Sequence, residues 1–213
     1  MTSLPVVLTL ACGLAVAGLV AAERRQNRTA KAVCKTAASS AFVGLALSLH
    51  AGGSPYGQAI LLALALSWVG DVCLLSERSA LFLSGLGFFL LGHLAFSAAF
   101  AAGALDLSAG AMGFGLMAVV SVLTLRWLWP HLAAFYRVAV TAYVLAIAAM
   151  CTLAVARGAA TGAWSMGVGA LLFAASDVSV ARDRFVAPGF VNRAWGLPAY
   201  YAAQLLLAWT VVR

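Results

Sequence analysis

The sequence predicts an all-α, polytopic membrane bundle of about eight transmembrane helices. Of its 213 residues, 64% are hydrophobic and only 9% are charged, whereas a soluble domain carries about 25% charged residues. The hydrophobic residues form long runs separated by short polar connectors. A spanning helix needs about 20 mostly apolar residues, so eight would use about 160 and leave only short loops. We therefore expect residues 1–213 to form a single transmembrane domain without a soluble appendage.

The apolar runs define the expected helices in order along the chain. The first run is followed, not preceded, by a basic cluster, which is the reverse of a secretory signal, so we interpret it as a retained helix. Glycine and proline separate several later runs, as is typical of connectors. The expected spans are 4–22, 32–50, 57–76, 80–102, 109–128, 134–156, 163–181 and 194–212.

The distribution of basic residues predicts an orientation. The net charge is +7, but the basic residues lie around the short connectors, so we expect no nucleic-acid partner. If eight spans alternate, one membrane side receives all but two of the 13 basic residues: Arg24, Arg25, Arg28, Lys31, Lys35, Arg78, Arg126, Arg137, Arg182, Arg184 and Arg193. The other side receives Arg157 and Arg213. The positive-inside rule then places both termini outside the cytoplasm, in what we expect to be a bacterial inner membrane.

A short motif recurs in the two halves of the chain. Gly70-Asp71-Val72 ends the third apolar run, and Ser176-Asp177-Val178 ends the seventh, at an offset of 106 residues. This predicts an internal repeat of residues 1–106 and 107–213, each with four helices. Four is an even number, so the two halves would share one orientation and both aspartates would lie on the same membrane side. A chance match of a short motif is the alternative.

Charged residues also follow each aspartate at the same spacing. Glu77 and Arg78 follow the first, and Asp183 and Arg184 follow the second. We interpret these four residues as solvated loop charges and lipid headgroup contacts.

Polar side chains inside the apolar runs are the candidate functional residues, because a charge within a bilayer is costly. They lie mostly in the cytoplasmic half, which predicts a cavity open to that leaflet; they are Lys35, Asp71, His93, Asp177, Tyr200, Tyr201 and Gln204. Tyr200 and Tyr201 are adjacent in a helix, so we expect only one of them to face the cavity.

Each candidate also has a purely structural interpretation. Asp71 and Asp177 would then only accept hydrogen bonds between helices or pair with Lys35. His93 would be a packing histidine, and Gln204 would bridge helices.

Two carboxylates at similar depth suggest acid–base chemistry. A low dielectric and a second nearby carboxylate both disfavour ionisation, so one aspartate would stay protonated while the other is ionised with help from Lys35. Such a pair suits a reaction that passes through an oxocarbenium-like cation. The four cysteines have no CxxC spacing, and no serine elbow or HExxH motif is present, so we expect no metal and no cofactor.

Four segments resemble the YhhN family of lysoplasmalogenases: residues 65–75, 88–93, 169–177 and 200–204. They contain Gly-Asp, Gly-His, Ser-Asp and Tyr-Tyr-x-x-Gln elements in this order, and the resemblance extends over essentially the whole chain. The family often has Lys-Pro where this chain has Lys35-Thr36, which is a departure beside a candidate residue.

The resemblance implies an enzyme that hydrolyses the vinyl-ether bond of a lysoplasmalogen. The products would be a fatty aldehyde and a glycerophospho-alcohol, and the partners would be a lysophospholipid substrate and membrane lipids. Asp71 and Asp177 match the catalytic aspartates of the family. The residues implied to bind substrate are Lys35, His93, Ser176, Tyr200, Tyr201 and Gln204.

Two other functions are compatible with the same residues. Membrane aspartates and a histidine also occur in proton relays, so a proton-coupled transporter of a small or amphiphilic solute is the main alternative. Such a transporter needs polar residues that reach both membrane faces, and the outer halves of these runs have few. A bundle that only binds lipids or partners would tolerate substitution of both aspartates.

Overall fold

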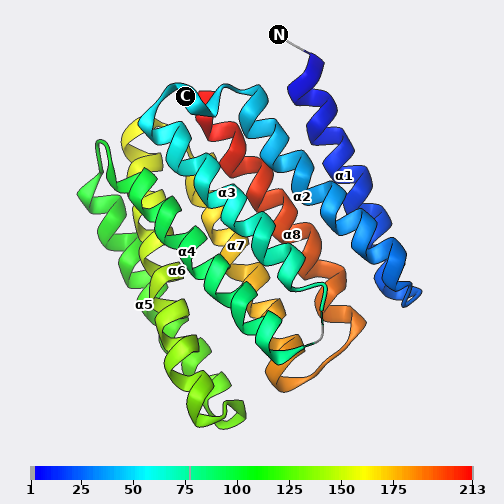
Figure 1. Ribbon diagram of the computed structural model, residues 1–213. Helices are drawn as coiled ribbons and strands as arrows, with labels where there is room; N and C mark the ends of the chain where they lie inside the picture. The colour runs from blue at the N-terminus through cyan, green and yellow to red at the C-terminus, as the bar shows by residue number, and fades with distance from the viewer. Residues whose placement is uncertain (1–2, 77, 213) are drawn as a thin grey trace.

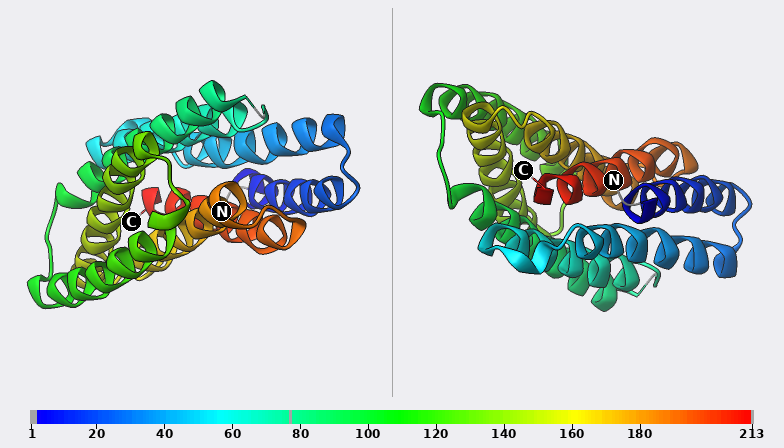
Figure 2. Two further views of the ribbon diagram at one scale, coloured as in Figure 1. Left: turned by 90° about the horizontal axis from the view of Figure 1, so that it is seen from below. Right: turned by 90° about the horizontal axis from the view of Figure 1, so that it is seen from above.

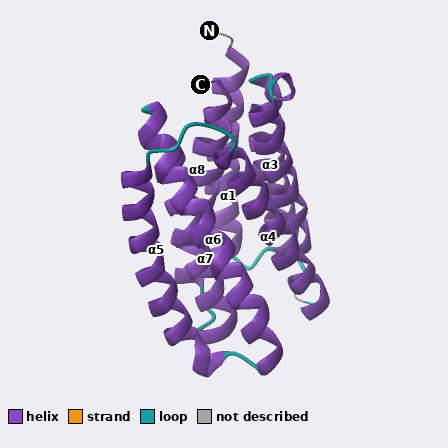
Figure 3. Cartoon of the chain, turned by 90° about the vertical axis from the view of Figure 1, so that its left-hand side faces the viewer, coloured by secondary structure: helices purple, strands orange, loops and turns teal. Residues whose placement is uncertain are grey.

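The computed structural model describes residues 3–76 and 78–212, and within them the secondary structure is helical with short loops (Figure 3). This confirms the predicted all-α membrane bundle. The α-helices are α1 Ser3–Arg24, α2 Arg28–Ser48, α3 Pro55–Cys73, α4 Ser79–Ala101, α5 Leu107–Leu128, α6 Ala134–Thr161, α7 Ser165–Ala181 and α8 Phe190–Trp209. Two residues used in the sequence analysis lie outside the described residues: Glu77, interpreted as a loop charge, and Arg213, assigned to the less basic membrane side.

Local capping interactions set several helix ends. The side chain of Asn27 accepts a hydrogen bond from the Ala30 N–H, so α2 begins at Arg28, four residues before the expected start. Gly162 adopts a left-handed conformation with φ of 70° and ends α6 at Thr161. Because α6 extends past its expected end, Arg157 lies within the helix. Its guanidinium donates hydrogen bonds to the Ala99 and Phe100 carbonyls of α4.

Successive helices run in opposite directions, and both termini lie at one end of the bundle (Figure 1). The connections α1–α2, α3–α4, α5–α6 and α7–α8 form the opposite end, which we call the basic end because its loops carry most of the basic residues. By length and composition, α1 to α6 are able to cross a membrane. α7 has only 17 residues, and α8 carries the polar side chains of Asn192, Arg193 and Gln204. α8 packs against four helices, which explains why a lipid-facing composition is not required of it, whereas α7 is apolar and differs by its shorter length.

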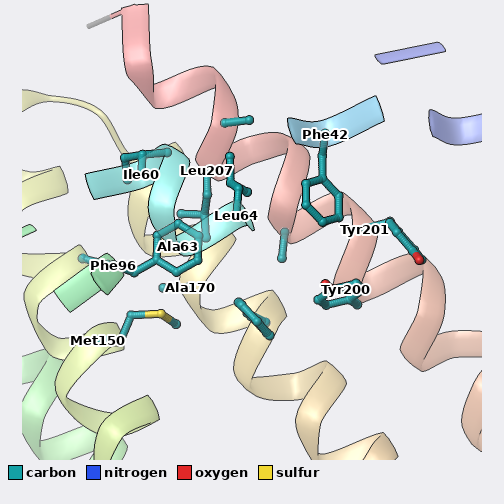
Figure 4. Close-up of a cluster of buried hydrophobic side chains, with 14 of the residues drawn as sticks. Phe42, Ile60, Ala63, Leu64, Phe96, Met150, Ala170, Tyr200, Tyr201 and Leu207 are labelled. Atoms are coloured by element: carbon teal, nitrogen blue, oxygen red, sulfur yellow. The ribbon is translucent and has the colours of Figure 1, made fainter. Parts of the chain in front are cut away.

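α8 has a central position in the bundle. It packs against α7, α1, α2 and α3, and it runs between the other helices in the end-on views (Figure 2). Its buried side chains join one apolar core, in which Tyr200, Tyr201 and Leu207 of α8 lie near Phe42 and Leu64 (Figure 4). α5 is peripheral and packs mainly against α6. Residues of α8 are therefore placed to contact helices from both halves of the chain.

The helix pairs correspond between the two halves. α1 packs with α2 as α5 packs with α6, and α3 packs with α4 as α7 packs with α8. This arrangement is compatible with the four-plus-four repeat, which stays a prediction.

Gly70 lets the Phe89 ring of α4 pack directly against α3 beside Asp71. A Cβ atom at this position would lie 2.8 Å from Cε2 of the Phe89 ring, a separation that side chains do not tolerate. Small residues at such interfaces let helix backbones approach closely in lipid. The position of the Phe89 ring therefore depends on the absence of a side chain at Gly70.

We expect the Gly70→Ala substitution to lower the thermal unfolding midpoint in detergent micelles. Overpacking of this kind costs about 1–3 kcal/mol, more than the helix propensity that alanine gains. Gly87→Ala is the matched control, because no atom lies within 4 Å of a Cβ at that position of α4. Equal midpoints for the two variants would contradict the proposed close contact.

Candidate active site

A cavity of about 450 Å³ extends from the basic end into the bundle. Its wall combines three kinds of residue. Charged side chains lie toward the basic end, polar side chains around the two aspartates, and apolar side chains on α5 and α6. The charged and polar members are Glu23, Lys31, Lys35, Asp71, Ser76, Ser121, Thr124, Tyr143, Ser176, Asp177, Ser179, Asp183, Arg184, Arg193 and Tyr200.

Asp71 is buried near the end of α3 and receives three direct contacts. Lys35 Nζ lies 3.1 Å from Oδ1, and the Ser39 and Tyr200 hydroxyls each donate to Oδ2 at 2.7 Å. Lys35 and Ser39 are one turn apart on α2, so both reach α3 on the same face. A buried carboxylate that is paired with a cation and accepts two hydrogen bonds is stabilised in its ionised form. Asp71 is therefore a carboxylate held by α2 and α8.

Tyr201 extends this network without contacting Asp71. Its hydroxyl lies 3.1 Å from Ser39 Oγ and 3.4 Å from the Lys35 carbonyl oxygen. Since Ser39 donates its single hydrogen to Asp71, the one hydrogen of the Tyr201 hydroxyl lies between two acceptors, Ser39 Oγ and the Lys35 carbonyl oxygen. Tyr201 thus orients the residue that binds the carboxylate.

Asp177 has different neighbours, although it also lies near the end of its helix, α7. The Tyr143 hydroxyl of α6 donates to Oδ1 at 3.2 Å, and His93 Nε2 of α4 lies 3.4 Å from Oδ2. No lysine or arginine contacts this carboxyl group among the interactions of the described residues. The two aspartates are therefore held in contrasting environments.

Aromatic rings connect the two aspartate environments. Tyr200, whose hydroxyl binds Asp71, has its ring centroid 5.4 Å from that of Phe173. The Phe173 centroid lies 4.5 Å from that of the His93 ring. Phe89 contacts both Tyr200 and Phe173 with edge-to-face geometry. Rings packed in this way have little freedom to move, so they fix the polar groups attached to them.

The charged end of the cavity is organised by Glu23 of α1. Its carboxylate is largely buried and lies 2.8 Å from Lys31 Nζ and 3.0 Å from Arg193 Nη1. Arg193 also binds Asp183 with Nε and Nη2, both at 3.1 Å. Ion pairs therefore join α1 to both α2 and α8 at the basic end.

Asp183 corrects one prediction from the sequence, because it is not a solvated loop charge. Its carboxylate accepts hydrogen bonds from the Gly189 N–H at 2.8 Å, from Asn192 Nδ2 and from Arg193. Burial opposes ionisation, but these bonds outweigh it and lower the pKa of Asp183 below its ordinary value. Arg184 is exposed, as expected, and its guanidinium lies 4.3 Å from the centre of the Phe82 ring.

The apolar part of the cavity lies along α5 and α6. On α5 it extends from Leu128 near the basic end to Met117, about 16 Å deeper at 1.5 Å per residue. On α6 it reaches Ile147. Met117 and Ile147 are both largely buried. This part of the cavity, which we call the apolar arm, is therefore lined by hydrophobic side chains over several helical turns.

The predicted site residues fall into two groups. Lys35, Asp71, Ser176, Asp177 and Tyr200 all lie on the cavity wall. The Ser176 hydroxyl, however, donates to the Phe173 carbonyl of its own helix. Only one of the adjacent tyrosines lines the cavity, as the helical geometry predicts, and it is Tyr200.

The second group does not line the cavity. His93 and Gln204 are fully buried, and Tyr201 is 1% exposed, so none of the three lines the cavity, and their role in substrate binding stays a prediction. They lie behind the wall because α4 and α8 turn these side chains toward the helix interfaces. His93 contacts Asp177, and Gln204 follows Tyr200 by one turn.

Ser39 and Tyr143 are the hydroxyl donors to the aspartates that the sequence does not single out. Ser39 could have been suspected from its spacing of four residues from Lys35 on one helix face. Tyr143 carries the signal of a phenol inside an otherwise apolar run. Glu23, which organises the basic end, lies at the last turn of α1 and resembles an ordinary loop-flanking charge in the sequence.

Comparison with known proteins gives one consistent result. The model of the YhhN family matches residues 30–211. The chain is 34% identical to Lysoplasmalogenase TMEM86A of Bos taurus over 164 residues, which cover 74% of this chain and 67% of the relative. It is 37% identical to Lysoplasmalogenase TMEM86B of Sus scrofa over 164 residues, covering 77% and 67%. A Lysoplasmalogenase of Mycobacterium tuberculosis is 37% identical over 154 residues, covering 68% of this chain and 57% of the relative. No solved structure matches the chain significantly.

Proposed function

Because this chain belongs to the YhhN family, we propose that it is a lysoplasmalogenase, an integral membrane hydrolase that cleaves the vinyl-ether bond of a lysoplasmalogen. The observation that carries this proposal is the pair of aspartates on the wall of one cavity that is charged at one end and apolar at the other. Asp71 and Asp177 are the proposed catalytic residues. Their unequal surroundings support unequal roles in acid–base catalysis.

The chemistry of a vinyl ether matches what two carboxyl groups supply. Protonation of the β-carbon gives an oxocarbenium ion, to which water adds to form a hemiacetal. The hemiacetal then separates into a fatty aldehyde and a glycerophospho-alcohol. One carboxylic acid donates the first proton, and one carboxylate activates the water. Lys35 and Tyr200 hold Asp71 in place for this reaction.

The shape of the cavity suggests how the substrate binds. The single alkenyl chain lies in the apolar arm between α5 and α6, which ends near Met117 and Ile147. The headgroup lies at the basic end, where Lys31 and Arg193 offer cations and Glu23 an anion. A zwitterionic phospho-amine headgroup matches this mixture of charges.

We expect Asp71→Asn and Asp177→Asn each to reduce aldehyde release by about 10²–10⁴-fold, the range of general acid–base catalysis. Aldehyde and fatty acid should be measured separately after incubation of the purified protein with alkenyl, alkyl and acyl lysophospholipids. Asp106→Asn is the control, because Asp106 caps α5 at the opposite end of the bundle. Full activity in either cavity variant would refute the catalytic role, and release of fatty acid alone would identify an acyl hydrolase.

A larger side chain at the end of the apolar arm should change the preference of the enzyme for the length of the alkenyl chain of its substrate. We expect Met117→Trp to lower kcat/KM for long alkenyl chains by about tenfold or more relative to short chains, because the indole fills space that the chain occupies. Met112→Trp is the matched control, since Met112 is on the same helix but faces outward with 71% exposure. A uniform loss for all chain lengths would argue against binding of the chain in this arm.

We also propose that the basic end faces the cytoplasm of a bacterium, with both termini outside and the catalytic site in the cytoplasmic half of the inner membrane. The excess of basic residues at this end supports the orientation. A phosphatase reporter that is active only outside the cytoplasm should be active when fused after Arg213. The same reporter inserted after His131, in the α5–α6 connection, should be inactive. The reverse pattern would invert the orientation.

A further inference from the structure

The two ring nitrogens of His93 have different and well-defined neighbours. Nδ1 lies 2.6 Å from the Phe89 carbonyl oxygen, one turn earlier on α4. A carbonyl oxygen can only accept, so Nδ1 must carry a hydrogen. Nε2 lies 3.4 Å from Asp177 Oδ2, and both atoms are buried without a hydrogen bond to any of the described residues, so each is the nearest polar partner that the other has. The protonation of the His93–Asp177 contact therefore depends on these two atoms alone.

A neutral His93 and an ionised Asp177 do not fit this geometry. With the hydrogen on Nδ1, Nε2 is an acceptor, and the facing carboxylate oxygen is also an acceptor. Two acceptors facing each other without water are unfavourable. One proton between them removes the conflict, either as a carboxylic acid that donates to Nε2 or as an imidazolium paired with a carboxylate. In both forms the pair holds one dissociable proton and has no net charge.

Among the contacts of the described residues, no other group supplies a proton to the Asp177 oxygen that faces His93. Tyr143 on α6 donates to Oδ1, the other carboxyl oxygen. The Cys151 thiol, also on α6, donates to the Ala170 carbonyl of α7. On α4, His93 is the titratable contact of Asp177. Asp71 differs in that Lys35, Ser39 and Tyr200 supply all the donors that an ionised carboxylate needs.

We propose, resting on the function proposed above, that Asp177 is the general acid of the reaction and that Asp71 is the carboxylate that activates water. His93 keeps the transferable proton at Asp177. It is a positioning residue, because its side chain is fully buried and does not line the cavity, whereas Asp177 does. The sequence repeat thus supplies two aspartates, and their neighbours give them opposite protonation states.

The proton transfers balance over one turnover. Asp177 gives its proton to the β-carbon, and the alkenyl ether becomes an oxocarbenium ion. Asp71 takes a proton from water as the water oxygen bonds to the cationic carbon, which yields the hemiacetal. Asp71 then returns this proton to the ether oxygen while Asp177 takes the hydroxyl proton of the hemiacetal. The carbon–oxygen bond breaks, the aldehyde and the alcohol leave, and both carboxyl groups regain their starting states.

The first test measures thermal unfolding, which does not depend on turnover. In Asp177→Asn the amide Nδ2 donates to His93 Nε2 in place of the shared proton, so we expect the unfolding midpoint of the wild type. In Asp71→Asn the buried Lys35 loses its counter-ion, so we expect a clearly lower midpoint. Combining Asp71→Asn with Lys35→Met should restore much of the loss. An equal loss in Asp177→Asn and Asp71→Asn would overturn the assignment.

The second test detects the proton itself. Infrared difference spectra at the pH of activity should contain the carbonyl stretch of a protonated carboxyl group that disappears in Asp177→Asn and persists in Asp71→Asn. If the proton resides on the ring, ¹⁵N NMR of His93 should instead report an imidazolium. Finding neither signal, or finding the carboxyl band removed by Asp71→Asn, would overturn the proposal even if the enzyme cleaves lysoplasmalogens.

The third test assigns the roles during the reaction. In deuterium oxide, Asp71→Asn should still protonate the β-carbon but add water slowly, so recovered alkenyl substrate should gain deuterium at that carbon. Asp177→Asn should return unlabelled substrate, and the opposite labelling would reverse the roles.

His93→Leu should shift the alkaline limb of the pH profile of kcat/KM, whereas a uniform decrease at all pH values would reduce His93 to a packing role. If neither the wild type nor any variant cleaves the substrate, the proposed function is wrong. The spectroscopic test of the proton at Asp177 does not depend on turnover and is judged independently.

Discussion

The ion pair between Lys35 and Asp71 joins α2 to α3, and the hydrogen bond from Tyr200 to the same carboxylate joins both to α8, which is far from them in the sequence. Burying either charge alone in a bilayer is expensive, and removing one partner from a buried pair costs about 3–5 kcal/mol. The pair is satisfied only when α2 and α3 are in register and Tyr200 of α8 reaches the same carboxylate. Tyr200 in turn packs on Phe89 and Phe173, and both of these residues contact His93, the neighbour of Asp177. The need to keep the buried charges of Lys35 and Asp71 paired therefore constrains the positions of the helices that form the cavity wall.

The two aspartates have partners from corresponding elements of the two halves. Asp71 on α3 is contacted from α2 and α8, and Asp177 on α7 is contacted from α6 and α4. Exchanging the halves converts one set of elements into the other, which supports the proposed repeat. The side chains at these positions differ, with lysine and serine on α2 but tyrosine on α6. Equivalent places in the two halves thus surround two carboxyl groups with different side chains.

Much of this site could be predicted from the sequence because burial of charge in a membrane is informative by itself. Asp71, Asp177 and Lys35 stand out in apolar runs, and the eight runs match the helices to within a few residues. The contacts of His93 and Tyr201 could not be predicted, because the rotation of α4 and α8 about their axes depends on packing. The environment of Asp183 also could not be predicted, since it depends on how the α7–α8 connection folds back toward Arg193.

The peripheral position of α5 has a consequence for the free energy needed to open the cavity by moving a helix. α5 forms one side of the apolar arm but packs mainly against α6, whereas α8 packs against four helices. Elements with few packed neighbours have the lowest free energies of local opening, well below that of global unfolding. Of the helices that enclose the arm, α5 can therefore separate from its neighbours at the smallest cost, while the helices that carry the two aspartates stay in place. The most deformable wall of the cavity is thus the helix that carries neither aspartate and none of the side chains that contact them.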